Sequence, residues 1–253
     1  MKSIYRIIKR LLPLSVKQFF KDILSITALE RRLEEIETLI HISKDDLSEH
    51  AKLRWRNAEP DTKLTWQQEL SGDNFIAKAI EYGVFGSEKN VLEIGPGYGR
   101  LLSASMGKNI PFASYTGLDI SSKNVAKLRE KFPFAHFEHG DVEKFRFPRH
   151  YDSVISSLVF KHIYPTFQKA MTNISSSLSE GAVVTIDLIE GNTKHFVSGP
   201  DKRHDTYIAE YQREEIEKIL QVAGLEFSCF DEVYHAHGHR RLLFVARKPL
   251  SSH

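Results

Sequence analysis

The sequence has 253 residues, enough for one large domain or for one domain with an appendage. Hydrophobic residues make up 41% and charged residues 27%, as in ordinary globular proteins, and the formal net charge of +2 is too small to indicate a nucleic-acid partner. The single cysteine, Cys229, excludes an internal disulfide and any metal site built from several cysteines, and it fits the reducing cytoplasm.

The first 50 residues follow a helical pattern. Up to Lys21 the chain has six basic residues and no acidic one, with apolar side chains on one helical face. This pattern predicts a helix on an anionic membrane surface, which would place the protein in the cytoplasm, peripheral to the inner face of the cell membrane. From Phe19 to Leu47 apolar residues repeat every seven positions, which predicts a coiled-coil seam for a homo-oligomer. The alternative is a helix that packs on the following domain of its own chain.

Three regions follow from the pattern along the chain. Residues 1–50 form the helical arm, and residues 51–86 form a lead-in of polar loop followed by a helix over 73–82. Residues 87–253 alternate short β-branched runs with amphipathic stretches, as βαβ units on a parallel sheet do.

The third region predicts seven strands in one doubly wound α/β sheet. The strands are expected at 91–94, 115–119, 136–138, 153–159, 182–189, 226–234 and 241–247. Helices are expected at 121–131, 166–178 and 213–223. The last two strands are close enough in sequence to form an antiparallel hairpin at the sheet edge.

The most informative motif is VLEIGPGYGR at residues 91–100, a glycine loop between a strand and a helix. Its glycines allow a sharp turn and a close approach of the backbone to a ligand. Glu93 repels phosphate but suits the α-amino group of an amino-acid moiety. A nicotinamide-binding pattern would need glycine where Arg100 stands.

Carboxylates follow the next two strands. Asp119 can accept hydrogen bonds from the vicinal hydroxyls of a ribose, as acidic residues do in dinucleotide folds. Asp141, in HGDVEKF, can accept one from an adenine amino group.

In this order, the motifs E-x-G-x-G-x-G, D, G-D and Y-D-x-V-x-S resemble those of the class I S-adenosylmethionine-dependent methyltransferases, over residues 90–248. The resemblance implies strand order 3-2-1-4-5-7-6 with the seventh strand antiparallel. It also implies S-adenosylmethionine as methyl donor and S-adenosylhomocysteine as product. The residues expected at the donor are Glu93, Gly95, Pro96, Gly97, Gly99, Asp119, Ile120, Asp141, Val142 and, from the lead-in, Trp66.

Methyl transfer needs alignment of donor and acceptor, and a base when the acceptor is a hydroxyl. His162, just after the fourth strand, is the candidate base. Relatives carry a similar histidine in an E-H pair, whereas Lys161 precedes it here. Asp187 and Glu190, at and beyond the end of the fifth strand, are alternatives. Each also has a structural interpretation, as a packed histidine or a solvated carboxylate.

Two segments are expected to shape the acceptor site. Residues 191–211 form a long connection, which is typical of a lid or binding loop. His235, His237 and His239 alternate as metal ligands on a strand can, but Gly238 favours a polar hairpin tip, so no metal is assigned.

The lead-in, RWRNAEPDTKLTWQQELSGDNF, is similar to that of methyltransferases found with bacterial surface-polysaccharide synthesis enzymes. Together with the membrane-surface arm, it predicts O-methylation of a saccharide hydroxyl. Two alternatives stay open: a small-molecule acceptor such as a quinone or secondary metabolite, and a donor-binding assembly protein without transfer activity. A nucleic-acid acceptor is not expected, because SLVFKHI lacks the Asn/Asp-Pro-Pro-aromatic motif of those enzymes.

Overall fold

The structure is a computed structural model that describes residues 44–57, 71–197, 206–234 and 240–251. The chain divides into two compact units, Met1–Leu47 and Ser48–His253, and the second contains nearly all described residues. The predicted membrane-surface helix and most of the coiled-coil seam lie outside the described residues. Within the described ranges, no helix has the length and apolar character needed to cross a membrane.

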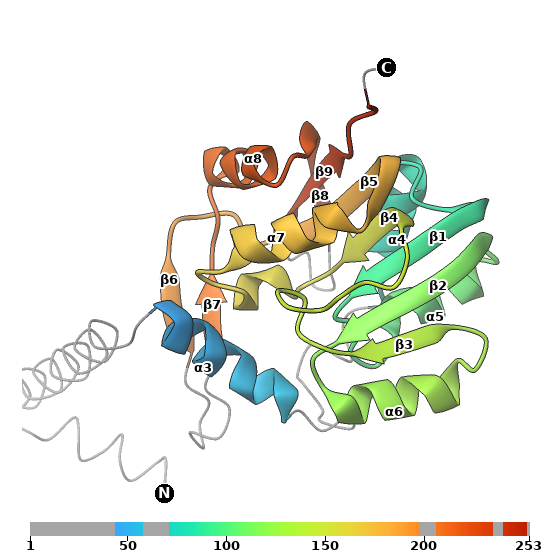
Figure 1. Cartoon of the computed structure of the whole chain (residues 1–253), viewed down its shortest axis with the longest axis horizontal. Helices are drawn as coiled ribbons and strands as arrows, with labels where there is room; N and C mark the ends of the chain where they lie inside the picture. The colour runs from blue at the N-terminus through green and yellow to red at the C-terminus, as the bar shows by residue number, and fades with distance from the viewer. Residues whose placement is uncertain (1–43, 58–70, 198–205, 235–239, 252–253) are drawn as a thin grey trace, which may run out of the picture. The chain divides into compact units, whose positions relative to one another are not determined.

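A seven-stranded sheet forms the centre of the second unit (Figure 1). Its strands are β1 Gly86–Ile94, β2 Phe112–Asp119, β3 His136–His139, β4 Tyr151–Ser156, β5 Leu178–Leu188, β8 Glu226–Tyr234 and β9 Arg240–Arg247. The order is β3-β2-β1-β4-β5-β9-β8, with β9 antiparallel to both of its neighbours. The predicted strand order and the edge hairpin are therefore confirmed.

Helices cover both faces of the sheet. The helices α4 Asp73–Glu81, α5 Arg100–Gly107 and α6 Ser122–Lys131 bury their apolar residues in one core cluster with the sheet. The helices α7 Phe167–Ser176 and α8 Arg213–Val222 pack together over the opposite face (Figure 1). Ser121 ends the turn before α6, and its Oγ accepts a hydrogen bond from Asn124 N at 3.3 Å, as a helix N-cap does. This double cover buries the central strands, which explains their continuous apolar sequences.

Strand β4 is shorter than predicted. It ends at Ser156 rather than at residue 159, and a 3₁₀ turn, η1 Phe160–His162, follows. Leu158 adopts a left-handed conformation with φ +66°, and its N–H donates to Asp187 Oδ1 at 2.6 Å. The chain leaves the sheet here because this N–H bonds a side chain of β5 instead of a neighbouring strand.

The connection after β5 also contains structure that was not predicted. Strands β6 Lys194–Val197 and β7 Thr206–Ala209 pair antiparallel in a separate two-stranded sheet. In Figure 1 they lie beyond the carboxyl ends of the parallel strands, next to η1, with which β7 makes contact. The connection is therefore a small hairpin-like cap over one end of the sheet.

The helix before the lead-in continues further than predicted. Helix α3, Lys44–Arg56, passes the expected end at residue 50. Lys52 Nζ lies 2.8 Å from Asp141 Oδ2 and 2.5 Å from Glu143 Oε1, and the side chains of Lys52 and Glu143 are almost fully buried. Ser48 Oγ lies 3.0 Å from Thr166 Oγ1 on the same side. These contacts hold the end of α3 against the loop after β3.

We expect Lys52→Met to destabilise this domain by about 3 kcal/mol, because removing one partner of a buried ion cluster leaves the others without compensation. Thermal unfolding followed by circular dichroism measures the effect. Lys144→Met is the matched control: Lys144 pairs with Glu49 at the surface, so its loss should cost about 0.5 kcal/mol. Equal shifts for the two variants would contradict a structural role for the buried cluster.

Candidate active site

The glycine loop lies between β1 and α5, at the carboxyl end of the sheet. Gly95, Gly97 and Gly99 have φ values of +69°, +57° and +81°. A Cβ on Gly95 would lie 2.4 Å from Val159 Cγ2, so the loop is packed tightly against the segment after β4. A Cβ on Gly97 would meet no atom within 4 Å, so the backbone is open at this point. The loop thus presents bare backbone at the position where a nucleotide fold binds its ligand.

Asp119 joins this loop to the turn after β2. Its Oδ2 accepts a hydrogen bond from Gly97 N at 2.9 Å, and its Oδ1 accepts one from Ser121 N at 2.8 Å. Burial raises the pKa of the Asp119 carboxyl, and these hydrogen bonds act in the opposite direction. A carboxylate fixed in this way has a defined orientation beside the open loop, and its expected role at a ribose stays a prediction.

Glu93 is the second carboxylate of this region. It is 2% exposed at the end of β1, and the Tyr115 hydroxyl donates to its Oε2 at 2.5 Å. Burial raises the pKa of Glu93 to about 7, although the hydrogen bond from Tyr115 opposes the shift. Glu93 is therefore close to half ionised at neutral pH, which makes it sensitive to a positively charged ligand.

The remaining predicted donor residues are spread around this loop. Asp141 is occupied by the ion pair with Lys52, so an adenine amino group would have to share its carboxylate. Val142 is buried, and its carbonyl accepts a hydrogen bond from Asn173 Nδ2 at 2.7 Å. Pro96 and Ile120 sit in the two turns that Asp119 joins, and Trp66 lies outside the described residues.

His162, the candidate base, lies in η1. It is 6% exposed, and its Nδ1 is 2.9 Å from the Tyr207 carbonyl oxygen. Only a protonated Nδ1 can donate to a carbonyl, so Nε2 carries the ring's lone pair. Burial, together with the charge of Lys161, lowers the pKa of His162 well below its usual value. The imidazole is therefore neutral at pH 7, in the tautomer that a base acting through Nε2 needs.

The two alternative carboxylates differ in position. Asp187 is fully buried at the end of β5, where its oxygens accept hydrogen bonds from Leu158 N and, at 3.0 Å, from Ser157 Oγ. Glu190 is exposed and forms an ion pair with Arg213, with 2.6 Å between Oε1 and Nε. Asp187 therefore lies beside the segment that leads to His162, whereas Glu190 is paired with Arg213 of α8.

Sequence reasoning assigned no function to Lys161, although its ammonium is buried. The side chain is 1% exposed, and burial lowers its pKa to about 7. Trp55 of α3 also reaches this region, with its ring centroid 4.7 Å from that of His162. The departure from the E-H pair of relatives was the one signal in the sequence that pointed to Lys161.

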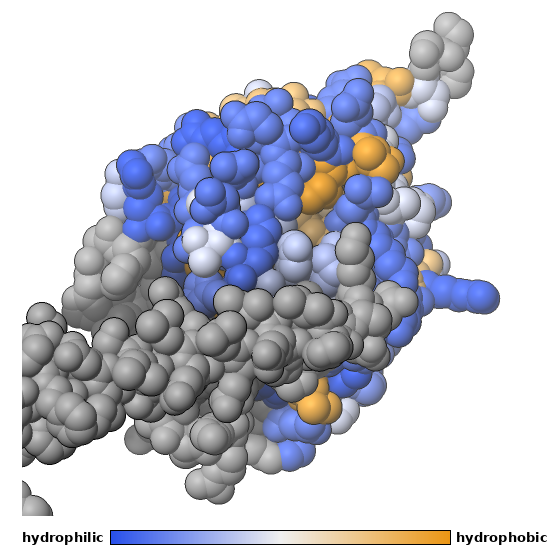
Figure 2. Space-filling model, turned by 90° about the vertical axis from the view of Figure 1, so that its left-hand side faces the viewer, coloured by the Kyte–Doolittle hydropathy of each residue, from blue (hydrophilic) through white to orange (hydrophobic). Residues whose placement is uncertain are grey.

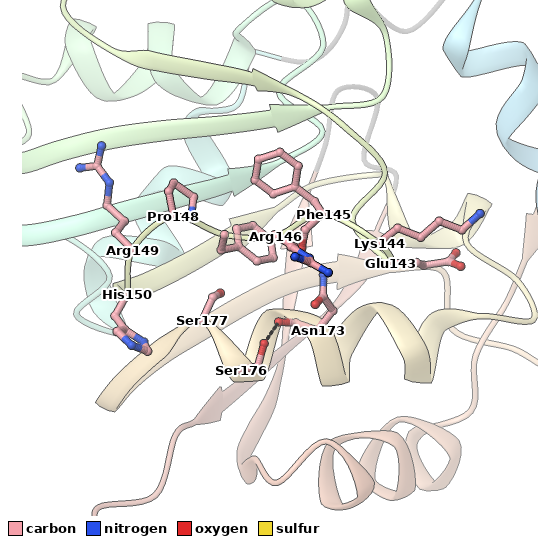
Figure 3. A pocket seen from close by; sticks show the side chains of 11 residues that line it. Glu143, Lys144, Phe145, Arg146, Pro148, Arg149, His150, Asn173, Ser176 and Ser177 are labelled. Atoms are coloured by element: carbon pink, nitrogen blue, oxygen red, sulfur yellow. Dashed lines mark hydrogen bonds between the residues drawn. The ribbon is translucent and has the colours of Figure 1, made fainter.

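The surface of this end of the molecule differs from the buried residues just described. The face at this end of the molecule is largely hydrophilic where it is described (Figure 2). A surface pocket of about 490 Å³ lies between the loop after β3 and α7, lined by residues such as Arg146, Arg149 and Asn173 (Figure 3). Its lining contains neither His162 nor Asp187, so it is separate from the catalytic candidates. No cluster of three or more metal-ligating side chains occurs among the described residues, and His235, His237 and His239 lie outside them.

Comparison with known proteins gives a consistent result. A family model described as a methyltransferase domain matches residues 66–229, well over half of the chain. The chain is 32% identical over 96 residues to a fatty-acid O-methyltransferase from Mycolicibacterium smegmatis, a match that covers 37% of this chain and 34% of that protein. The chain thus spans about a third of the length of this curated relative.

Solved structures share the fold at low sequence identity. One is a Burkholderia thailandensis 1,6-didemethyltoxoflavin-N1-methyltransferase with its substrate and S-adenosylhomocysteine bound, with a TM-score of 0.61 and 17% identity over 80% of this chain and 89% of that one. Another is an S-adenosylmethionine-dependent methyltransferase from Clostridium acetobutylicum, with a TM-score of 0.55 and 16% identity over 74% of this chain and 94% of that one.

We expect donor affinity to depend on pH through Glu93. With a pKa of about 7, the fraction of ionised Glu93 falls about fivefold from pH 7 to pH 6, and the binding of a cationic amino group should weaken by the same factor. Isothermal titration of S-adenosylmethionine at the two pH values measures the change. Glu93→Gln should bind weakly at both values, with no such dependence. A wild-type affinity that does not change with pH would show that Glu93 does not face the charged group.

Proposed function

The chain belongs to the methyltransferase domain family, with the class I S-adenosylmethionine-dependent fold, and on this premise we propose that it methylates an acceptor oxygen, specifically a saccharide hydroxyl used in the synthesis of bacterial surface polysaccharide. The observation that carries the oxygen assignment is the neutral imidazole of His162. A hydroxyl must lose its proton during transfer, and His162 has the tautomer and charge state of a proton acceptor.

The chain's own residues divide the task between two halves of the site. Glu93 and Asp119 would hold the donor's amino-acid and ribose parts over the open backbone of Gly97, and this open backbone fits such a ligand. When bound, S-adenosylmethionine supplies a sulfonium methyl group: the carbon–sulfur bond breaks as the oxygen–carbon bond forms, and the electron pair stays on the sulfur of S-adenosylhomocysteine.

His162 Nε2 takes the hydroxyl proton as the new bond forms. It then releases this proton to solvent, so that the imidazole is neutral for the next cycle. Tyr207 fixes the ring through Nδ1, and Trp55 packs against it. Asp187 acts as a positioning residue, because its hydrogen bonds to Leu158 N and Ser157 Oγ shape the turn that precedes η1. Glu190 is engaged with Arg213 and has no role in this scheme.

A second candidate acceptor is a carboxylate oxygen. The relative from Mycolicibacterium smegmatis is named a fatty-acid O-methyltransferase, and its local similarity to this chain favours this chemistry. A carboxylate is already ionised at neutral pH, so its methylation needs no base. The dependence of the rate on His162 therefore separates the two candidates.

The N-terminal arm supports the saccharide proposal only through its sequence. A basic amphipathic helix would bring the enzyme to a lipid-linked acceptor at the cytoplasmic face of the membrane, and a coiled-coil seam would pair two copies. Both roles fall largely on residues 1–43, which lie outside the described residues.

We expect labelled methyl groups from S-adenosylmethionine to enter the saccharide or lipid-linked saccharide fraction of a bacterial extract when the full chain is added. Scintillation counting of separated fractions measures the transfer. Label in quinones or other small metabolites would contradict the saccharide assignment. If calorimetry shows donor binding but no fraction becomes labelled, the chain is a donor-binding assembly protein instead.

For a hydroxyl acceptor, His162→Gln should reduce the transfer rate by about 10²- to 10⁴-fold and leave the Kd for the donor unchanged, because general-base catalysis contributes a factor of that size. With donor and acceptor both saturating, the wild-type rate should fall in acid as the imidazole becomes protonated, and because its pKa is lowered this fall should begin well below neutral pH. His136→Gln, at an exposed position of β3, is the control. A His162→Gln enzyme with the wild-type rate would remove the base and favour the carboxylate acceptor.

A further inference from the structure

Three cationic side chains from separate elements converge near Asp187. Arg100 begins α5, Lys161 lies in η1, and Arg241 lies in β9. Arg100 Nη2 donates to Ser157 Oγ at 2.7 Å, and Ser157 Oγ donates to Asp187 Oδ2. A hydrogen-bonded chain therefore connects the glycine-loop side of the site to the end of β5.

The sheet register brings Arg241 to the same place. Asp187 pairs with Leu243 across β5 and β9, and directly paired residues project their side chains from the same face. Because side chains alternate along a strand, Arg241 projects from that face as well, two residues nearer the carboxyl end of β5. Turn η1, which carries Lys161, contacts β5, and the charges of Arg241 and Asp187 both act on Lys161.

Two donors of this group have no partner within the described part of the chain. They are Arg100 Nη1 and Arg241 Nε, and both atoms are buried. Buried donors on charged groups are rare without an acceptor, and each calls for an explanation such as a ligand. Two N–H groups from two guanidinium ions match the two oxygens of one carboxylate.

The electrostatics of Lys161 agree with this geometry. Burial, together with the charges of Arg241, Arg100 and Arg54, lowers the pKa of Lys161 to about 7, and the charge of Asp187 opposes this shift. An added negative charge would stabilise the ammonium form, so a bound anion and the protonated lysine would favour each other.

We propose that Arg100, Lys161 and Arg241 bind a carboxylate group of the acceptor at the carboxyl ends of β4 and β5. The inference rests on the proposed methyl transfer and narrows its acceptor to an acidic one, such as a uronate-bearing saccharide or a fatty acid. Lys161 directly precedes His162, so the carboxylate is held next to the proposed base. The three cations select and orient the acceptor and take no part in bond breaking.

The first test identifies the acceptor chemically. The compounds that receive labelled methyl groups in the extract are separated by anion exchange at neutral pH, before and after mild alkali. Label that stays on an anion after alkali marks an ether on a carboxylate-bearing acceptor, and label released as methanol marks a methyl ester of the carboxylate itself. Both results support the proposal and distinguish the methylated oxygen. Alkali-stable label on neutral compounds, or on anions that lose their charge with phosphatase, would overturn it.

The second test assigns the residues. With the acceptor fraction so identified, Lys161→Met and Arg241→Gln should each lower kcat/KM at least tenfold, mainly through KM, with the Kd for S-adenosylmethionine within twofold of the wild type. The matched controls are Lys169→Met on the exposed side of α7 and Arg247→Gln at the exposed end of β9, and both should retain wild-type kinetics.

The melting temperature of Lys161→Met distinguishes a loss of acceptor binding from a loss of folding. Unlike Lys52, which pairs with two carboxylates, Lys161 has a lowered pKa because burial and neighbouring arginine charges disfavour its ammonium form. Lys161→Met should therefore melt at or above the wild-type temperature while losing acceptor affinity. Unchanged KM in both variants would overturn the proposal. Absence of any transfer by the wild type, with donor binding intact, would instead refute the proposed function on which it rests.

Discussion

The Asp119 carboxylate holds the glycine loop after β1 and the turn after β2 together. One oxygen accepts from Gly97 N in the loop after β1, and the other accepts from Ser121 N in the turn after β2. Parallel strands bring such turns to the same sheet edge, but they do not fix the distance between them. A single buried carboxylate with two backbone donors does so, and it keeps the open backbone of Gly97 facing the ligand side. The positions of the helices α5 and α6, which begin just after these turns, follow from this connection.

A second set of contacts places the wall of the site that comes from outside the sheet. Helix α3 is tied down by Lys52, which pairs with Asp141 and Glu143, and its Trp55 ring packs against His162. The β6–β7 pair contributes from the other side, through the Tyr207 carbonyl that accepts the His162 Nδ1–H bond. The imidazole is thus oriented by two segments that precede and follow the strands carrying the chemistry. Neither segment belongs to the central sheet. In the proposed reaction they would shape the acceptor side, which can vary while the sheet and its glycine loop are retained.

The parts of this arrangement that sequence reasoning predicted are those with a local pattern. The strands, the glycine loop and the position of Asp119 follow from apolar runs that end at turn residues. The strand order is implied by the resemblance to class I methyltransferases, which those local motifs carry. The β6–β7 pair gave no such signal, because two four-residue strands separated by a long polar stretch look like a loop. The pairing of Lys52 with Asp141 joins residues 89 positions apart, and nothing near Lys52 marks it as buried. The early end of β4 depends on the Asp187 carboxylate, which accepts the hydrogen bond from Leu158 N. The two residues are distant in the sequence, so no local pattern predicts this contact.

The two halves of the site carry opposite charge, and this polarity suits a methyl transfer between unlike partners. The ends of β1 and β2 present Glu93 and Asp119, whereas the region of β4, β5 and β9 gathers Arg100, Lys161 and Arg241 around one carboxylate. In the proposed reaction, a cationic donor would be favoured by the first half and an acidic acceptor by the second. Transfer removes the sulfonium charge from the donor. The proposed contacts of Glu93 with the amino group and of Asp119 with the ribose would be the same in substrate and product, so only the loss of the sulfonium charge would make the acidic half hold its product less strongly than its substrate.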